Sequence, residues 1–310
     1  MADIVISEFI NDAALETLSD DFDVDYDPSL FERVADLENA VSECRALIVR
    51  NRTQVNESLL DAATNLEVIG RLGVGLDNID MRACKKRDIR VFPATGANVV
   101  SVAEYVIAAL LILFRGAYSA SDAVLLGRWP RNDYMGLEAS GKTLGIMGFG
   151  AIGRAVASRA IAMEMRVVAN DAHIEPDSNC WERYGVEPVD VTTLLKQSDA
   201  LTLHVPLTPQ TRHIIDENAI RTMKTGAVII NTARGGVLDE RALARALREG
   251  RLRGAALDVY ENEPLPAQSH LVGVPNLILT PHIGGVTEES NARVGALIAG
   301  RIKQALTDDR

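Results

Sequence analysis

The run GFGAIG, Gly148–Gly153, constrains the fold of this chain more than any other feature of its sequence. The apolar segment Thr143–Met147 before it predicts a β-strand, and Ile152–Met163 after it has the pattern of a helix. A second apolar segment, Val167–Ala169, leads to Asp171, which stands eighteen residues after the last glycine. A strand, a glycine turn, a helix, a second strand and a terminal acid together predict a dinucleotide-binding unit.

The three glycines have separate roles in such a unit. Gly148 permits the tight turn, Gly150 lets the backbone approach a pyrophosphate, and Gly153 lets the helix pack closely on the strand. The exposed N–H groups at the helix start, which include those of Ala151 and Ile152, favour a phosphate charge. A glycine-rich turn that binds no ligand is the alternative, and the surrounding pattern favours the dinucleotide site.

Asp171 indicates which dinucleotide such a site selects. A carboxylate at this position accepts hydrogen bonds from the adenosine ribose, and it repels the additional 2′-phosphate of NADP. The sequence therefore predicts NAD as the cofactor.

Charge limits the remaining classes of function. The net charge of −11 and the isoelectric point near 5.0 argue against nucleic-acid binding. An anionic substrate would be repelled by this field, so local arginines must capture it. The acidic run Asp20–Asp25 is most simply a solvated loop or strand edge, with adaptation to salt as the alternative.

The sequence predicts neither a membrane span nor a metal site. Val99–Phe114 is the longest apolar stretch, but it is too short to cross a bilayer and is interrupted by Ser101 and Glu104, so we expect a buried helix. The N-terminus lacks the basic region and apolar core of a signal peptide, and the histidines show no ligand spacing. Three scattered cysteines without a CxxC motif favour a reduced, cytoplasmic setting: Cys44, Cys84 and Cys180.

Strand and helix patterns alternate along the chain, which predicts parallel sheets with crossover helices. In the first hundred residues the predicted strands are Ile4–Ile6, Ala46–Val49, Val68–Leu72 and Arg90–Phe92. The predicted helices there are Asp12–Leu18, Glu57–Ala63 and Met81–Lys86, followed by the long helix Val99–Arg115.

The second region continues the alternation. Its predicted strands are Leu144–Met147, Val167–Ala169, Ala200–Leu203, Ala227–Ile230, Gly254–Leu257 and Leu277–Leu279. Its predicted helices are Ile152–Met163, Thr192–Lys196, Glu217–Arg221, Glu240–Glu249 and a final helix, Glu288–Leu306. Asp239 and Thr287 are predicted N-caps, and Gly250 a C-terminal stop.

We therefore predict an α/β chain with two doubly wound parallel-sheet domains. A Rossmann-type NAD-binding domain, residues 99–282, is inserted into a flavodoxin-like substrate domain, residues 1–98 and 283–310. The final helix returns to the first domain and makes it discontinuous.

Three short segments place unusual polar residues just after predicted strands. They carry Arg234, Glu263 and His282, and in an open α/β sheet ligands bind beyond the carboxyl ends of strands. Oxidation of a hydroxyl by NAD needs a base for the O–H proton, and histidine suits this role because its pKa lies near neutrality. A carboxylate would orient the histidine, and the arginine would bind a carboxylate and polarise a carbonyl oxygen.

Four segments, GKTLGIMGFGAIGR, NTARGGVLDE, LDVYENEP and TPHIGG, carry a resemblance to the D-isomer-specific 2-hydroxyacid dehydrogenases. The resemblance implies His282 as the acid/base, Glu263 as its partner and Arg234 as a substrate ligand. It implies that Asp258 lies near the nicotinamide carboxamide, and that a homodimer forms through the NAD-binding domain. The further cofactor contacts that it implies come from His204, Pro206, Thr211 and Ala233.

Within this family the chain most resembles the 3-phosphoglycerate dehydrogenases, through IVRN, GRLGVG and WPRNDYMG. This resemblance implies that the backbone of Val74 and Gly75 holds the substrate carboxylate. It also implies that Arg50, Arg71 and Arg131 contact a distal anion; surface arginines without such a role are the alternative. Short relatives include enzymes for 3-sulfolactate, whose sulfonate resembles the phosphate.

These observations predict a dehydrogenase that transfers a hydride between NAD and a small D-configured 2-hydroxy acid with a second anion at C3. The substrate would be 3-phosphoglycerate or (S)-3-sulfolactate. Two alternatives stay open: a hydroxypyruvate or glyoxylate reductase, and a non-catalytic interaction protein that senses NADH.

Overall fold

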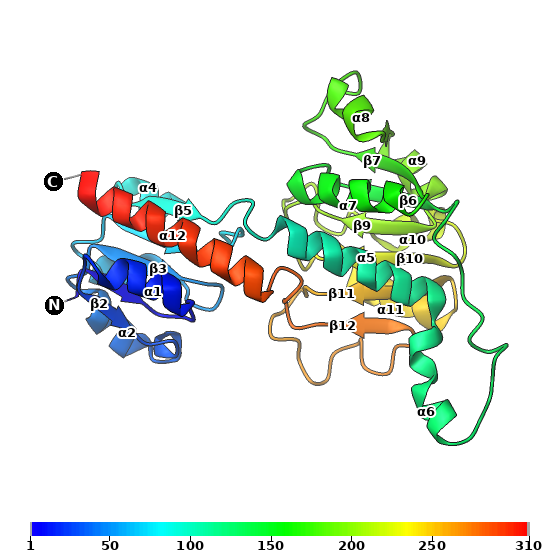
Figure 1. Cartoon of the computed structure of the whole chain (residues 1–310), viewed down its shortest axis with the longest axis horizontal. Coiled ribbons are helices and arrows are strands. Elements are labelled where there is room, and N and C mark those ends of the chain that lie inside the picture. The colour runs from blue at the N-terminus through cyan, green and yellow to red at the C-terminus, as the bar shows by residue number, and fades with distance from the viewer. Residues whose placement is uncertain (1, 309–310) are drawn as a thin grey trace. The chain divides into compact units, whose positions relative to one another are not determined.

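The computed structural model describes residues 2–308 (Figure 1). These residues form two compact units. The first unit holds the residues up to Asn98 together with those from Val286 onward, and the second is Val99–Gly285. Each unit is built on one parallel sheet.

The first unit has a five-stranded sheet with strand order β2-β1-β3-β4-β5. Its strands are β1 (Ile4–Ile6), β2 (Val24–Tyr26), β3 (Ala46–Val49), β4 (Val68–Arg71) and β5 (Arg90–Pro93). Its helices are α1 (Asp12–Ser19), the 3-10 turn η1 (Leu30–Glu32), α2 (Val34–Val41), α3 (Glu57–Ala62), α4 (Met81–Lys86) and α12 (Glu288–Asp308).

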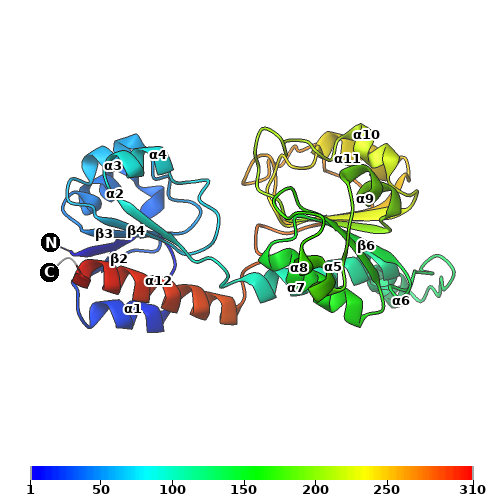
Figure 2. The ribbon, with the colours of Figure 1, turned by 90° about the horizontal axis from the view of Figure 1, so that it is seen from above.

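Helices cover both faces of this sheet, as Figure 2 shows. α1 and α12 pack on one face, where Ile298 and Ile302 of α12 are fully buried. α12 approaches the sheet so closely that a Cβ on Gly70 would lie 2.6 Å from the Ile298 side chain. α2, α3 and α4 cover the other face. Because both faces are buried, the inner strands β1 and β3 are continuous apolar runs rather than alternating ones.

The second unit has a seven-stranded sheet with strand order β12-β11-β10-β9-β6-β7-β8. Its strands are β6 (Thr143–Met147), β7 (Arg166–Asn170), β8 (Glu187–Pro188), β9 (Ala200–Leu203), β10 (Ala227–Asn231), β11 (Leu252–Leu257) and β12 (Leu277–Leu279). Its helices are α5 (Val99–Arg115), the 3-10 turn η2 (Ala117–Ala120), α6 (Ser121–Leu125), α7 (Ala151–Ala162), α8 (Asn179–Tyr184), α9 (Val191–Gln197), α10 (Glu217–Thr222) and α11 (Glu240–Arg248).

The strand order of this sheet reverses at β6, which has β7 on one side and β9 on the other. α5, α7 and α8 cover one face of the sheet, and α9, α10 and α11 cover the other (Figure 2). Ligands of open α/β sheets bind beyond the carboxyl ends of the strands at such a reversal. The predicted class, two doubly wound parallel sheets, is confirmed.

The predicted helix signals hold in detail. The Asp239 carboxylate accepts hydrogen bonds from the backbone N–H groups of Arg241 and Ala242 at the start of α11. The Thr287 hydroxyl accepts one from the N–H of Ser290 in α12. Gly250 has a φ of +68°, the left-handed conformation that ends α11.

Several short elements were not predicted. β2 lies in the acidic run at the sheet edge, where Asp23 and Asp25 are exposed, so the strand-edge interpretation of that segment is confirmed. β8 has two residues, too few for a readable period. α2 starts without a side-chain cap, and α6 is a single short turn, so neither had a clear N-terminal signal.

The apolar stretch Val99–Phe114 is confirmed as a buried helix, since α5 buries eight residues in the core of the second unit. Among residues 2–308, no single helix has both the length and the apolar composition to cross a membrane. α5 and the segment Ala117–Leu125 meet those criteria only when they are taken together, and they are bent by 60°.

Candidate active site

The turn between β6 and α7 has the close contacts that a dinucleotide site needs. Gly148 has a φ of +96°, and a Cβ there would lie 2.5 Å from the carbonyl oxygen of His204. A Cβ on Gly153 would lie 2.4 Å from the carbonyl oxygen of Gly148. Gly150 has open space where its Cβ would stand. Two glycines therefore let the elements pack, and the third leaves the helix start accessible.

The N-terminus of α7 offers free backbone donors at this open position. The helix begins at Ala151, and its N-cap, Gly150, has no side chain that could accept a hydrogen bond. The first N–H groups of the helix, including those of Ala151, Ile152 and Gly153, have no partner inside the helix. A pyrophosphate accepts such hydrogen bonds and is also stabilised by the helix dipole.

Asp171 lies at the end of β7 and is tied to the glycine turn. One carboxylate oxygen accepts a hydrogen bond of 2.7 Å from the N–H of Phe149, and the other accepts one of 2.9 Å from the N–H of His173. Each oxygen can accept a second hydrogen bond. The residue is therefore fixed in place with acceptor capacity left over, which fits the predicted ribose contact.

We expect Asp171→Ala to raise the ratio of kcat/KM with NADPH to kcat/KM with NADH by roughly 10- to 100-fold, the scale of a lost charged hydrogen bond and a removed repulsion. Asp171→Asn keeps an acceptor for Phe149 and removes only the charge, so it separates the two effects. Steady-state rates with both cofactors measure the ratio. An unchanged ratio in both variants would rule out the ribose contact.

The segment after β9 carries the predicted contacts His204, Pro206 and Thr211. Desolvation lowers the pKa of His204 to about 3, so its ring is neutral, and Nε2 lies 3.0 Å from the Thr202 hydroxyl. The Thr211 hydroxyl donates a 2.6 Å hydrogen bond to the carbonyl of Pro206, which closes the loop. Together with the glycine turn, this segment lies at the sheet reversal and fits NAD.

His282 and Glu263 form a direct pair. The Nδ1 atom of His282 lies 2.7 Å from Oε2 of Glu263. A carboxylate only accepts hydrogen bonds, so Nδ1 carries the hydrogen and Nε2 is the atom that remains to exchange a proton. The His282 side chain is 37% exposed, which leaves it accessible to a small molecule.

Glu263 is held as a carboxylate. Burial raises the pKa of Glu263, but the hydrogen bond from His282, the charge of that ring, the N–H of Tyr260 and the Arg234 guanidinium together outweigh it and leave the pKa below its ordinary value. Within this pair, the charged Glu263 carboxylate accepts the hydrogen bond from Nδ1 and so orients the His282 imidazole.

Arg234 lies in the loop after β10, the strand that pairs with β11. Its guanidinium donates a 2.6 Å hydrogen bond to the carbonyl of Ala233, and its charge acts on Glu263. The Asn231 side chain stabilises the conformation of this segment. Its amide N–H donates a hydrogen bond to the carbonyl of Arg234, and its amide oxygen accepts one from the N–H of Ala233. A Cβ on Gly235 would lie 1.7 Å from the carbonyl oxygen of Tyr260, so the loops after β10 and β11 touch.

Asp258, predicted near the nicotinamide, is 2% exposed and binds the segment that carries His282. One oxygen, Oδ1, accepts from the Thr280 hydroxyl at 2.6 Å and from the N–H of Ile283 at 2.8 Å. The other, Oδ2, accepts from the N–H of Gly284 at 2.7 Å. Two acceptor positions on each oxygen leave one open, on Oδ2. A carboxamide contact with Asp258 would have to use that position.

One buried polar atom at this edge of the sheet was not anticipated. The hydroxyl of Thr232 is buried, and among residues 2–308 no hydrogen-bond partner lies within reach of it. It follows β10 directly, between Asn231 and Ala233. A buried hydroxyl without a partner is costly, and a bound ligand can satisfy it.

In the first unit, Arg50 and Arg71 lie at the ends of neighbouring strands. Val49 of β3 pairs with Arg71 of β4, and Arg50 is the next residue of its strand segment. The Arg50 guanidinium donates a 2.6 Å hydrogen bond to the Asn291 side chain of α12 and lies 5.6 Å from the ring of Phe9. Burial lowers the pKa of Arg50, with the carboxylate of the nearby Glu8 opposing that shift.

The loop behind Arg50 is fixed by a buried acid that sequence patterns do not reveal. Glu8 is 4% exposed and accepts hydrogen bonds of 2.8 to 3.1 Å from the N–H groups of Arg50, Arg52 and Thr53. The predicted carboxylate-binding backbone follows β4 in the same unit, where Val74 is 38% exposed.

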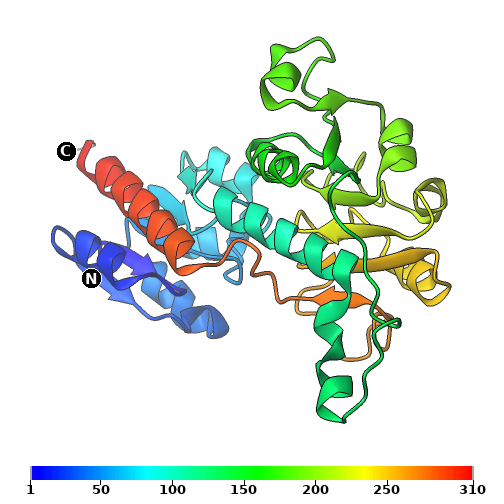
Figure 3. The same cartoon turned by 45° about the vertical axis from the view of Figure 1, so that its right-hand side comes forward.

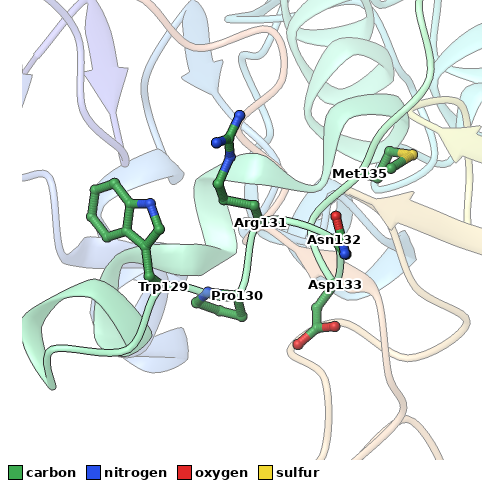
Figure 4. Close-up of a pocket in the computed structure, with 6 residues that line it drawn as sticks. All are labelled: Trp129, Pro130, Arg131, Asn132, Asp133 and Met135. Carbon is green, nitrogen blue, oxygen red and sulfur yellow. The ribbon is translucent and has the colours of Figure 1, made fainter.

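Arg131 lies in the second unit, in the segment that follows α6. It lines a surface pocket of about 500 Å³ whose lining comes entirely from the segment between Trp129 and Met135. In Figure 4 the Arg131 side chain points away from Asp133. Of the three predicted anion ligands, Arg50 and Arg71 therefore lie at the ends of adjacent strands, and Arg131 lies in an exposed loop.

The comparisons with known proteins agree with this geometry. A model of the D-isomer specific 2-hydroxyacid dehydrogenase NAD-binding domain matches residues 107–284. An (S)-sulfolactate dehydrogenase from Chromohalobacter salexigens is 50% identical over 99% of both chains. A D-3-phosphoglycerate dehydrogenase from Methanocaldococcus jannaschii is 40% identical over 99% of this chain, which spans only 58% of that protein.

A solved structure supports the cofactor. A D-lactate dehydrogenase from Aquifex aeolicus, complexed with NAD and lactic acid, has a TM-score of 0.85 and 29% identity over 99% of this chain and 96% of its own. The glycine turn, the open start of α7 and the placement of Asp171 all fit NAD. The chain belongs to the D-isomer specific 2-hydroxyacid dehydrogenase family and is an NAD-dependent dehydrogenase.

Proposed function

We propose that this enzyme interconverts a D-configured 2-hydroxy acid that carries a second anion at C3 with its 2-oxo acid. (S)-3-Sulfolactate is the leading candidate and 3-phosphoglycerate the next. The hydroxy acid and NAD⁺ give the oxo acid, NADH and a proton. The contact between His282 and Glu263 carries the reaction class, because it couples a proton-exchanging ring to a fixed carboxylate.

In this proposal NAD⁺ would accept the hydride, and residues of the chain bind the substrate and transfer the proton. Nε2 of His282 takes the hydroxyl proton during oxidation and returns it to the carbonyl oxygen during reduction. Glu263 stabilises the protonated ring and fixes its orientation. Arg234 binds the C1 carboxylate and polarises the C2 oxygen, and the backbone of Val74 and Gly75 binds the same carboxylate.

The choice of a doubly charged substrate rests on the arginines. A protein with a net charge of −11 needs local cations to hold a dianion. We propose that Arg50, Arg71 and Arg131 bind the distal anion. The names of two relatives, a sulfolactate and a phosphoglycerate dehydrogenase, support a substrate with such a group, and the first relative matches essentially the whole chain.

The proposal is tested by NADH oxidation at 340 nm with sulfopyruvate, phosphohydroxypyruvate, hydroxypyruvate and glyoxylate in parallel. A preference of ~10²-fold or more for one of the first two would support the distal-anion site and name the anion. A preference for hydroxypyruvate or glyoxylate would favour the reductase alternative. Binding of NADH without turnover of any of the four would favour the NADH-sensing alternative.

We also propose a homodimer formed through the second unit, in a cytoplasmic setting. The supporting surface is the arm, defined here as residues 117–136. It contains α6 and stands away from the sheet of its unit in Figures 1 and 3. Its most exposed apolar side chains are 70 to 84% accessible: Tyr118, Leu125, Leu126, Trp129 and Met135. Apolar side chains gathered on one projecting segment are typical of an interface.

Leu125→Glu is expected to convert the dimer to a monomer, because a carboxylate in an apolar interface core is strongly unfavourable. Light scattering after size-exclusion chromatography measures the mass. Val34→Glu is the matched control, since Val34 is an exposed valine of the other unit that the proposal leaves outside the interface. A monomeric parent protein, or a dimer that survives Leu125→Glu, would contradict an interface at the arm.

A further inference from the structure

The segment that carries His282 has an unusual backbone conformation. His282 has a φ of +55°, in the left-handed region that residues other than glycine seldom adopt. Such a conformation is unfavourable and persists only where surrounding contacts determine it. The contacts that hold residues 280–284 therefore decide where the imidazole lies.

Asp258 supplies the acceptors of this arrangement, through its bonds to Thr280, Ile283 and Gly284. The fit is close, since a Cβ on Gly284 would lie 2.9 Å from Oδ2 of Asp258 and 3.5 Å from the ring of Tyr105. The turn is thus enclosed by a carboxylate and an aromatic ring from α5.

Tyr105 also reaches the turn through its hydroxyl. The oxygen lies 2.7 Å from the hydroxyl oxygen of Thr280. Thr280 has a single hydroxyl hydrogen, and it is used in the 2.6 Å bond to Asp258. Tyr105 must therefore be the donor, so the hydrogen bonds run in one direction, from Tyr105 to Thr280 to Asp258.

Tyr105 is suited to be a permanent donor. Burial raises the pKa of Tyr105; the bond to Thr280 lowers it by less, and the negative charge of Asp258 adds a smaller raising effect, so the pKa stays above its ordinary value. The phenol is therefore neutral at pH 7. A chain of hydrogen bonds that ends on a buried carboxylate is stronger than its separate members.

A second tyrosine holds the same turn from its other side. The hydroxyl of Tyr260 donates a 2.8 Å hydrogen bond to the carbonyl of Thr280. Its backbone N–H donates a 3.1 Å hydrogen bond to Oε1 of Glu263. Tyr260 thus contacts both the turn of His282 and the carboxylate that pairs with His282.

We infer that Tyr105 is a positioning residue for proton transfer, acting through Thr280 and Asp258 to keep Nδ1 of His282 on Glu263. The inference rests on the proposed role of His282 in the reaction. Tyr105 lies 175 positions from Thr280, and no motif near it indicates this role. In this arrangement the hydroxyl affects the chemical step and leaves the binding of NADH unchanged.

The test is Tyr105→Phe, which removes the hydroxyl and keeps the ring against Gly284. We expect kcat for reduction of the preferred oxo acid to fall by roughly 3- to 10-fold, the scale of one neutral hydrogen bond, with the Kd for NADH unchanged by fluorescence titration. Thr280→Val should give a similar loss, and Thr280→Ser should restore activity because it keeps the hydroxyl. Tyr26→Phe, a half-buried tyrosine of β2 in the other unit, is the matched control.

The decisive measurement is the same substitution in a His282→Ala background. If Tyr105 acts through His282, the double variant has the kcat of His282→Ala alone. An equal loss in both backgrounds would overturn the inference, as would an unchanged kcat in Tyr105→Phe. If His282→Ala itself retains full activity, the proposed role of His282 fails, and that outcome is read from the single variant.

Discussion

We expect His282→Ala to lower kcat for reduction of the preferred 2-oxo acid by roughly 10²- to 10⁴-fold, the usual effect of losing a general acid. The physical reason is that the carbonyl oxygen loses its proton donor when Nε2 is removed, while the NAD site, built around β6 and α7, is untouched. The Kd for NADH should therefore stay within about twofold of the parent value by fluorescence titration.

Two further measurements sharpen this prediction. Added imidazole should restore part of the kcat of His282→Ala, since the small base can occupy the space left beside Glu263. Glu263→Gln keeps an acceptor for Nδ1 and removes the charge, so its loss should be smaller than that of His282→Ala. Turnover of His282→Ala within a factor of three of the parent would exclude His282 as the acid.

Arg50→Ala is expected to raise KM for the doubly charged substrate by ~10²-fold, because a well-placed charged contact contributes about 3 kcal/mol. KM for glyoxylate, which has no distal anion, should change by less than about threefold. Arg131→Ala should show the same contrast if the exposed loop that carries it supplies the third cation.

Matched controls separate binding from loss of local structure. Arg50→Lys retains the charge but not the two-pronged geometry, so its effect on KM should be intermediate. Arg52 is two residues away and stacks 4.2 Å from the ring of Phe31, and Arg52→Ala should leave both KM values near those of the parent. Equal changes in KM for both substrates in Arg50→Ala would remove Arg50 from the distal-anion site.

The sequence was sufficient to predict the apolar strands, the long helices and the helices with capping side chains. Most strands of both sheets are apolar runs, α5 is apolar along most of its length, and α11 and α12 begin at capping side chains, so local patterns were sufficient for these elements. The contact between Glu263 and His282 was also anticipated, because both follow predicted strands and the family resemblance implied that they pair.

Other features depend on contacts between distant residues, which local patterns do not contain. Tyr105 resembles any aromatic residue on a buried helix until its hydroxyl is seen beside Thr280. Glu8 looks like a surface acid after a strand, yet it is buried against the N–H groups of the loop at Arg50. Arg131 belongs to a segment without regular secondary structure, so no periodic pattern in the sequence predicted where its side chain lies.

The part played by α12 in the core of the first unit has a consequence during synthesis of the protein. Ile298 and Ile302 complete the apolar layer over β1, β3 and β4, but they leave the ribosome after the whole second unit. At ~5–20 residues per second, the first ninety-eight residues wait roughly 10–40 s with that face of their sheet covered only by α1. The second unit, being contiguous, can fold in that interval, so the part of the chain made first is the last to become complete.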